Sequence, residues 1–156
     1  MEAEQVDELS SKNVIVIPSK TVPQGITAIL SFDPSASADD NKEAMVEALS
    51  MVKTGSVTFA TRDSEFDGFD IKEGDIMAME EGKITNVGGT PNEAVMFLLD
   101  KMVDDSSSII SIYYGEDITA EQAGEIEMLV SEKYSDCDIM IQTGGQPLYY
   151  YIISVE

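Results

Sequence analysis

Hydrophobic residues in the last third of the chain change their spacing from one segment to the next. Residues 109–113 form a short apolar run that stops at Gly115, which is typical of a strand buried on both faces. Thr119 and Gln122 follow with the spacing of a capping box, so we expect a helix from about Ala120. Its apolar stripe is predicted to lie on a sheet and comprises Ala123, Ile126, Leu129, Val130 and Tyr134.

Two more strands are predicted after this helix. A strand at 138–143 follows a connection that favours a parallel pairing with 109–113 and a right-handed crossover. The Gly144-Gly145 pair can supply the positive φ of a hairpin turn. We therefore expect 148–155 to return beside 138–143 as the last strand.

The first third of the chain reads as a strand and two helices. Residues 13–17, NVIVI, predict a buried strand, and Thr21 with Gln24 predicts a helix over about 23–32. A capping pattern at Asp40 predicts the next helix. Its residues facing the core are expected to be Ala44, Met45, Ala48, Leu49 and Val52.

The middle of the chain alternates between apolar and polar residues. A strand over 57–61 ends at Arg62-Asp63, and short strands separated by glycine turns predict an antiparallel meander over 68–87. Thr90 to Glu93 is a capping box with Pro91 in the first turn, and the helix it starts is predicted to bury Val95, Leu98, Leu99 and Met102. The predicted fold is α/β, with a mixed, partly parallel sheet, flanking helices and a small inserted meander. One domain is expected over 13–156, after a frayed leader at 1–12.

The charge of the chain narrows its range of partners. Nine basic and 30 acidic residues among 156 give a net charge of −21, which disfavours nucleic acid and anionic membranes. A uniformly acidic surface also serves solubility or adaptation to salt. No signal peptide and no apolar run long enough to span a bilayer is present, so we expect a cytoplasmic location and no membrane insertion.

The residue types exclude several kinds of catalytic site. The chain has no histidine, which removes Ser-His, Cys-His and imidazole-zinc arrangements. Its one cysteine, Cys137, is interpreted as a partly buried structural thiol. The acidic stretch 63–70 lacks the glycine and the terminal glutamate of a calcium loop, so no metal site and no catalytic residue is predicted.

Charged and small residues follow several of the predicted strands. A sheet could bring the strand ends near Lys20, Arg62, Gly115 and Gly145 to one edge, where open α/β folds bind ligands, although plain loops are the alternative. Lys20 and Thr21 could contact an anion or only cap a helix, and Arg62 could bind an anion or pair with Asp63. The candidate contacts for a ligand or partner are Lys20, Thr21, Gln24, Arg62, Asp63, Gly115, Glu116, Thr143, Gly144, Gly145 and Gln146.

Several stretches carry a family resemblance: VIVIPSKTVPQGITAILSFDP (14–34), VKTGSVTFATRDSEFDG (52–68), IKEGDIMAMEEGKI (71–84), IYYGEDIT (112–119) and GGQPLYYYIISVE (144–156). From about residue 13 the chain resembles the carboxyl-terminal domain of the catalytic subunit of bacterial fatty acid kinase, in the dihydroxyacetone-kinase-like family. The resemblance implies a DegV-like fold. It also implies an ATP-binding domain, with its ATP and magnesium, and a middle domain that precede this one in the parent, and a start of this sequence inside the natural domain.

The resemblance implies a role as well. In the parent, a fatty acid held by a DegV-type acyl-binding protein is phosphorylated for phospholipid synthesis, and this domain is expected to engage that partner or orient the kinase domains without catalysing anything or holding a cofactor. Two alternatives stay open. The domain could bind a fatty acid itself among Met45, Leu49, Phe59 and Met77, with its carboxylate near Lys20, Arg62 or Thr143. A phosphotransferase would need a phosphate-cradling loop and a magnesium-binding carboxylate set, which the sequence does not display.

Overall fold

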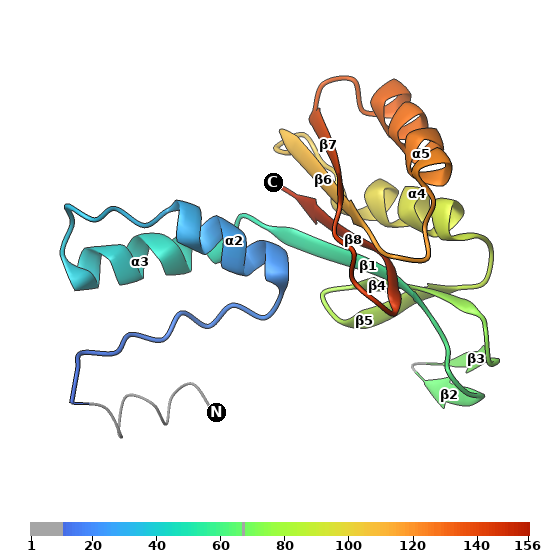
Figure 1. The fold of residues 1–156 in the computed structure, drawn as a ribbon, viewed down its shortest axis with the longest axis horizontal. Coiled ribbons are helices and arrows are strands. Elements are labelled where there is room, and N and C mark those ends of the chain that lie inside the picture. Colours follow the sequence, from blue (N-terminus) through green and yellow to red (C-terminus); the bar gives the residue numbers. More distant parts are fainter. Residues whose placement is uncertain (1–10, 67) are drawn as a thin grey trace. The chain divides into compact units, whose positions relative to one another are not determined.

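A computed structural model describes residues 11–66 and 68–156, and its chain divides into two compact units, 1–52 and 53–156. The helices and strands follow the order given in Figure 1. The first unit contains α2 (Val22–Leu30) and α3 (Ala38–Leu49), which pack against each other. The second unit contains the strands together with α4 (Pro91–Met102) and α5 (Ala120–Lys133).

The main sheet of the second unit is mixed. Over its described residues it has six strands in the order β5-β4-β1-β8-β6-β7. Only β6 and β7 pair in parallel, as predicted, and the other neighbours are antiparallel. The strands are β1 (Lys53–Phe59), β4 (Ile76–Glu80), β5 (Lys83–Val87), β6 (Ile109–Tyr114), β7 (Asp138–Thr143) and β8 (Tyr149–Val155). The short strands β2 (Ser64–Phe66) and β3 (Phe69–Ile71) form a separate antiparallel pair.

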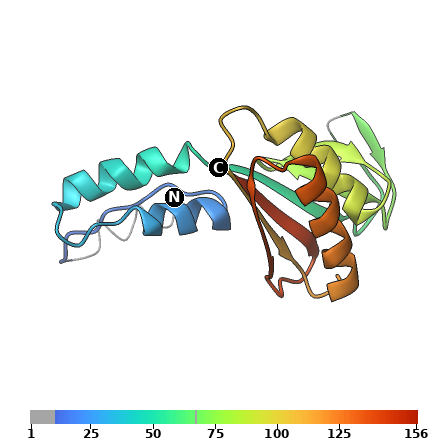
Figure 2. The ribbon, with the colours of Figure 1, turned by 90° about the horizontal axis from the view of Figure 1, so that it is seen from above.

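The core lies between one face of this sheet and the two helices α4 and α5, which Figure 2 shows on the same side of the strands. The predicted inward residues of α4 are all fully buried, because they repeat at helical spacing over β1, β4 and β8. Ala123, Ile126 and Val130 of α5 are buried too, whereas Leu129 is 47% exposed and Tyr134 is only half-buried. The predicted stripe of α5 was therefore too wide by Leu129.

Helix starts follow the capping pattern closely. Thr90 and Thr119 both form complete capping boxes, with Glu93 and Gln122 as their partners. The predicted start of α3 at Asp40 was wrong, because Ser37 is the N-cap and accepts the backbone N–H of Asp40. Ser37 and Asp40 satisfy the same spacing one turn earlier, so the helix gains a turn. Ala44, expected inside, is exposed.

Two strand predictions were wrong. Residues 13–17 form no strand, since no neighbouring strand pairs with them; they run extended and half-buried, with Ile15 and Ile17 lining a hollow with Met45 of α3. Strand β8 does not return beside β7. It lies between β1 and β6, because both of its edges find antiparallel partners there, and β7 is left at the sheet edge. The predicted meander is also divided, since β4 and β5 extend the main sheet and only β3 pairs outside it.

Candidate functional site

The pairing of the strands places several predicted strand ends at one edge of the main sheet. Thr58 near the end of β1 pairs with Tyr149 at the start of β8, and Tyr114 at the end of β6 pairs with Thr143 at the end of β7. Tyr114 also pairs with Tyr151 of β8. The segments that follow β1, β6 and β7 therefore leave the sheet at the same edge, as expected for the part of the site that lies in this unit.

The glycines at this edge let two segments cross closely. The backbone N–H of Gly115 donates to Tyr150 O at 2.9 Å, and that of Glu116 donates to Gln146 O at 3.2 Å. The Gly144 N–H donates to Tyr114 O at 2.9 Å. A Cβ at position 115 would lie 2.1 Å from Tyr149 O, so only glycine fits there. These contacts hold the loop of 144–148 over the end of β6.

The side chain of Gln146 completes this crossing. Its Nε2 donates to Tyr113 O at 2.9 Å, and Gly145 has the left-handed φ of 61° that the predicted glycine turn required. The structure thus brings together Gly115, Glu116, Thr143, Gly144, Gly145 and Gln146. Their hydrogen bonds described above are made to one another and to neighbouring backbone, which gives them a structural role in this edge.

The helix N-termini at this edge are already satisfied. The side chains of Glu93 and Gln122 accept the N-cap N–H groups at 2.8 and 3.0 Å, and the two threonine hydroxyls accept the N–H groups of the first turns. A free helix N-terminus binds anions through such N–H groups. The capping boxes therefore lower the capacity of α4 and α5 to bind a phosphate.

A buried tyrosine, which the sequence analysis did not single out, connects this edge to α4. The Tyr151 hydroxyl donates to Asn92 Oδ1 at 2.7 Å, and burial, with a smaller contribution from the charge of Glu125, raises the pKa of Tyr151 to about 12. Asn92 Nδ2 in turn donates to Gln122 O of α5 at 3.4 Å. An aromatic residue near the start of a central strand was the available signal for this contact.

Lys20, Thr21 and Gln24 belong to the first unit. Thr21 is the N-cap of α2 and accepts the Gln24 N–H at 3.3 Å, while Gln24 Oε1 accepts the Lys20 N–H at 3.0 Å. Thr21 and Gln24 thus perform the capping role that was the alternative to anion binding. The ammonium group of Lys20 is on an exposed residue.

Arg62 and Asp63 follow β1 but do not pair with each other. Asp63 Oδ1 accepts the Glu73 N–H at 2.9 Å, and Asp63 Oδ2 lies 4.0 Å from Lys72 Nζ. Lys72 bonds Asp70 more closely, at 2.9 Å, and this contact raises the pKa of Lys72. The acidic stretch is therefore organised around one lysine, and no group of metal-binding side chains is found in the part of the chain that the structure describes.

A cavity of about 420 Å³ adjoins Arg62. It lies between the end of β1, the strands β4 and β5, and the β2–β3 hairpin. Phe59 and Met77, two of the residues predicted to hold an acyl chain, line it. The remaining lining residues are Ala60, Thr61, Ser64, Glu65, Phe66, Ile71 and Ile84.

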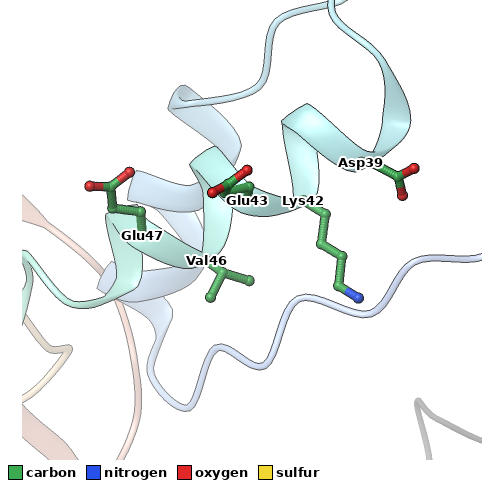
Figure 3. Close-up of a pocket in the computed structure, with 5 residues that line it drawn as sticks. All are labelled: Asp39, Lys42, Glu43, Val46 and Glu47. Carbon is green, nitrogen blue, oxygen red and sulfur yellow. The ribbon is translucent and has the colours of Figure 1, made fainter.

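A second hollow, of about 540 Å³, runs along one side of α3 and is lined by Asp39, Lys42, Glu43, Val46 and Glu47. All five residues come from this one helix, and Figure 3 shows their side chains spreading apart instead of converging on a point. A ligand needs groups that converge on it. This hollow is therefore a solvated helix face and gives no candidate site.

Comparisons with known proteins place the chain in a family. Residues 1–156 match the FakA-like carboxyl-terminal family, the C-terminal domains of fatty acid kinase subunits of this kind. The chain is 42% identical over 156 residues to Protein YloV of Bacillus subtilis, covering all of this chain and 28% of that protein. It is 38% identical over 156 residues to an uncharacterized protein of Staphylococcus haemolyticus, again covering all of this chain and 28% of the relative. The sequence thus corresponds to a little over a quarter of these relatives.

The fold has a match among solved structures. The DegV family protein Cg2579 from Corynebacterium glutamicum aligns with a TM-score of 0.67 and 16% identity, over 98% of this chain and 68% of that one. This confirms the predicted DegV-like α/β fold. No helix among residues 11–66 and 68–156 is long and apolar enough to cross a membrane. With the whole-length match, the chain belongs to the FakA-like carboxyl-terminal family of fatty acid kinase and has a DegV-like fold.

Proposed function

We propose that this chain is the non-catalytic carboxyl-terminal domain of an ATP-dependent fatty acid kinase subunit, and that it engages a DegV-type protein carrying the fatty acid or orients the kinase domains toward it. The observation that supports this most is the match of all 156 residues to the family of such domains. In this proposal ATP and magnesium belong to the kinase domain of the parent, which works in the cytoplasm and supplies phospholipid synthesis.

Two further observations agree with a role in positioning. The DegV-like fold gives this domain the same architecture as the proposed partner, and proteins of one architecture often present matching surfaces to each other. The sheet edge described above is held together by contacts within the chain and offers no arrangement of a nucleophile and a base among its described residues. Chemistry would then take place on the parent polypeptide outside residues 1–156.

Binding of the partner is the direct test. The chain should be titrated calorimetrically with an acyl-loaded DegV-type protein from the same genome, and an acidic protein of unrelated fold should serve as the control for charge effects. We expect association with a Kd of about 100 µM or tighter, which corresponds to a transient interface. Absence of association into the high micromolar range, together with unchanged phosphorylation by a parent enzyme that lacks this domain, would refute both forms of the proposal.

Catalysis by the chain alone is tested separately. Incubated with ATP, magnesium and a fatty acid, the isolated chain should release no acyl phosphate and no ADP above the protein-free rate. Turnover of nucleotide by this chain would overturn the non-catalytic assignment, whatever its affinity for the partner.

Binding of a fatty acid by this domain itself is the second candidate function. The four residues proposed for the acyl chain fall in different units, with Met45 and Leu49 in 1–52 and Phe59 and Met77 in 53–156. Phe59 and Met77 line one cavity beside Arg62, and this observation favours a smaller version of the idea confined to the second unit.

A further inference from the structure

Arg62 has an unusual position among the basic residues. It is the only arginine of the chain, beside eight lysines. Lys53, Lys72, Lys101 and Lys133 each form an ion pair with a nearby carboxylate. The Arg62 side chain has no hydrogen bond or ion pair with any residue that the structure describes.

The reason lies in the neighbours of Arg62. Asp63, the nearest carboxylate in sequence, is directed to the Glu73 N–H and to Lys72, as described above. Ala60, on the other side, continues the sheet pairing, because its N–H donates to Asp75 O at 2.9 Å and its carbonyl accepts the Gly74 N–H at 2.8 Å. These bonds fix the backbone on the approach to Arg62 and engage the carboxylate that would otherwise neutralise it.

The cavity beside Arg62 is mostly apolar. Its walls are Phe59 of β1, Met77 of β4, Ile84 of β5 and Ile71 of β3, and Phe66 of β2 stands at its rim with 55% exposure. Figure 1 shows β2 and β3 beyond the end of β1, apart from the main sheet. The volume of about 420 Å³ lies within the range of small-molecule sites, about 300–1,000 Å³.

We propose that this cavity, named here the Arg62 cavity, binds the anionic head and the first part of the chain of a single-chain amphiphile. The planar guanidinium of Arg62 can donate two parallel N–H bonds to a carboxylate or to a phosphate. The apolar walls then remove the adjoining methylenes from water, at about 0.8 kcal/mol for each one buried. This inference gives the second candidate function a location and a head-group contact, and it does not require the DegV-type partner.

Two charges oppose the anion and define how tight binding can be. Glu65 lines the same cavity, and the net charge of −21 disfavours the approach of any free anion. The affinity must therefore come from the local contact with Arg62 and from the apolar walls. Replacement of Glu65 by glutamine should strengthen anion binding by about threefold, since a pair of like charges near the surface costs under about 1 kcal/mol.

The test is a titration followed by NMR on the whole chain, without the partner, using decanoate, decyl phosphate and the neutral decanol below their aggregation limits. Arg62→Gln removes the guanidinium from an exposed residue, so the fold is expected to persist. Lys83→Gln is the matched control: it removes the same charge from β5, and its side chain points away from that of its neighbour Ile84. Met77→Gln tests the apolar wall.

We expect wild-type protein to bind at least one of the two anions with a Kd of about 1 mM or tighter, and Arg62→Gln to weaken this binding about tenfold. Lys83→Gln should leave it unchanged, and Met77→Gln should weaken it. Binding of decanoate alone identifies a carboxylate ligand, and binding of decyl phosphate alone identifies a phosphorylated one; either supports the proposal. Decanol binding as tightly as the anions, equal affinities of Arg62→Gln and wild type, or no shift of signals from residues 59–84 would overturn it.

The two proposals fail separately. Loss of amphiphile binding in Arg62→Gln with normal partner association supports the Arg62 cavity and leaves the interaction role standing. Partner association without any amphiphile binding refutes the cavity alone.

Discussion

The hydroxyl of Tyr151 in the central strand β8 donates a 2.7 Å hydrogen bond to Asn92 Oδ1 in the first turn of α4. Tyr151 is fully buried, and Asn92 also donates to the Gln122 carbonyl of α5. One side chain thus connects the middle of the sheet to the starts of both helices that cover it. The two capping boxes and this contact together fix the edge of the sheet where the strand ends meet.

Removal of this hydroxyl should cost stability without changing the fold. Tyr151→Phe keeps the ring in the core but leaves Asn92 Oδ1 without its donor, which we expect to lower the free energy of unfolding by about 1 kcal/mol. Urea denaturation followed by circular dichroism measures this value. Tyr149→Phe, at a residue 40% exposed, is the control and should change it by less than about 0.5 kcal/mol. Equal stability of wild type and Tyr151→Phe would show that the bond contributes nothing.

The same tyrosine should make stability depend on pH in the alkaline range. Its pKa is raised from 10.0 to about 12, so the folded protein holds the phenolic proton more tightly than the unfolded chain does. The stabilisation is therefore fully present below pH 10 and is lost as the pH rises toward 12. We expect wild type to lose more stability than Tyr151→Phe when urea titrations at the two ends of this range are compared. Parallel losses in the two proteins would contradict the assignment to Tyr151.

Gly115 should tolerate no side chain. A Cβ at this position would approach Tyr149 O to 2.1 Å and Gln146 O to 2.7 Å, and both atoms are backbone. Gly115→Ala must move the crossing loop, and we expect it to destabilise the protein by about 3 kcal/mol or more. Gly124 in α5 is the matched control, because a Cβ there meets nothing within 4 Å. Gly124→Ala should stabilise the protein by about 0.5–1 kcal/mol through helix propensity, so the two substitutions should have opposite signs in the same urea assay.

Local sequence signals predicted the elements of this protein better than their neighbours in the sheet. The capping boxes at Thr90 and Thr119 were found because all their contacts lie within four residues. The position of β8 between β1 and β6 depends on pairings across most of the unit, and a glycine pair beside β7 suggested a tight hairpin instead. The loop instead runs across the end of β6 and places Leu148, not only Gly145, at a positive φ, here 69°.

The candidate site shows the same division. The sheet edge formed by Gly115 and Gly144 followed from strand ends that the sequence displays, whereas the Arg62 cavity needs walls from four separate strands. Phe66, Ile71 and Ile84 carry no signal in sequence that would group them with Arg62. Only the default pairing of Arg62 with Asp63 could be proposed from sequence, and the backbone of Glu73 takes that carboxylate.

Asn41 should be essential to the first unit. It is 6% exposed; its Oδ1 accepts the Asp33 N–H at 2.7 Å, and its Nδ2 donates to the carbonyls of Asp33 and Ser37 at 2.8 and 3.1 Å. Asn41→Asp replaces this donor by an oxygen facing carbonyl oxygens, so we expect α3 and the loop before it to lose about 1–3 kcal/mol of stability.

Hydrogen exchange measured by mass spectrometry suits this prediction, because the two compact units need not unfold together. Peptides covering 33–49 should exchange faster in Asn41→Asp, while peptides of β6 and β8 keep their wild-type rates. Glu47→Gln, an exposed change on the same helix, is the control and should leave both sets unaltered. Wild-type exchange at 33–49 in Asn41→Asp would mean that the Asn41 hydrogen bonds do not hold the turn before α3, because their loss has to open that segment first if they do.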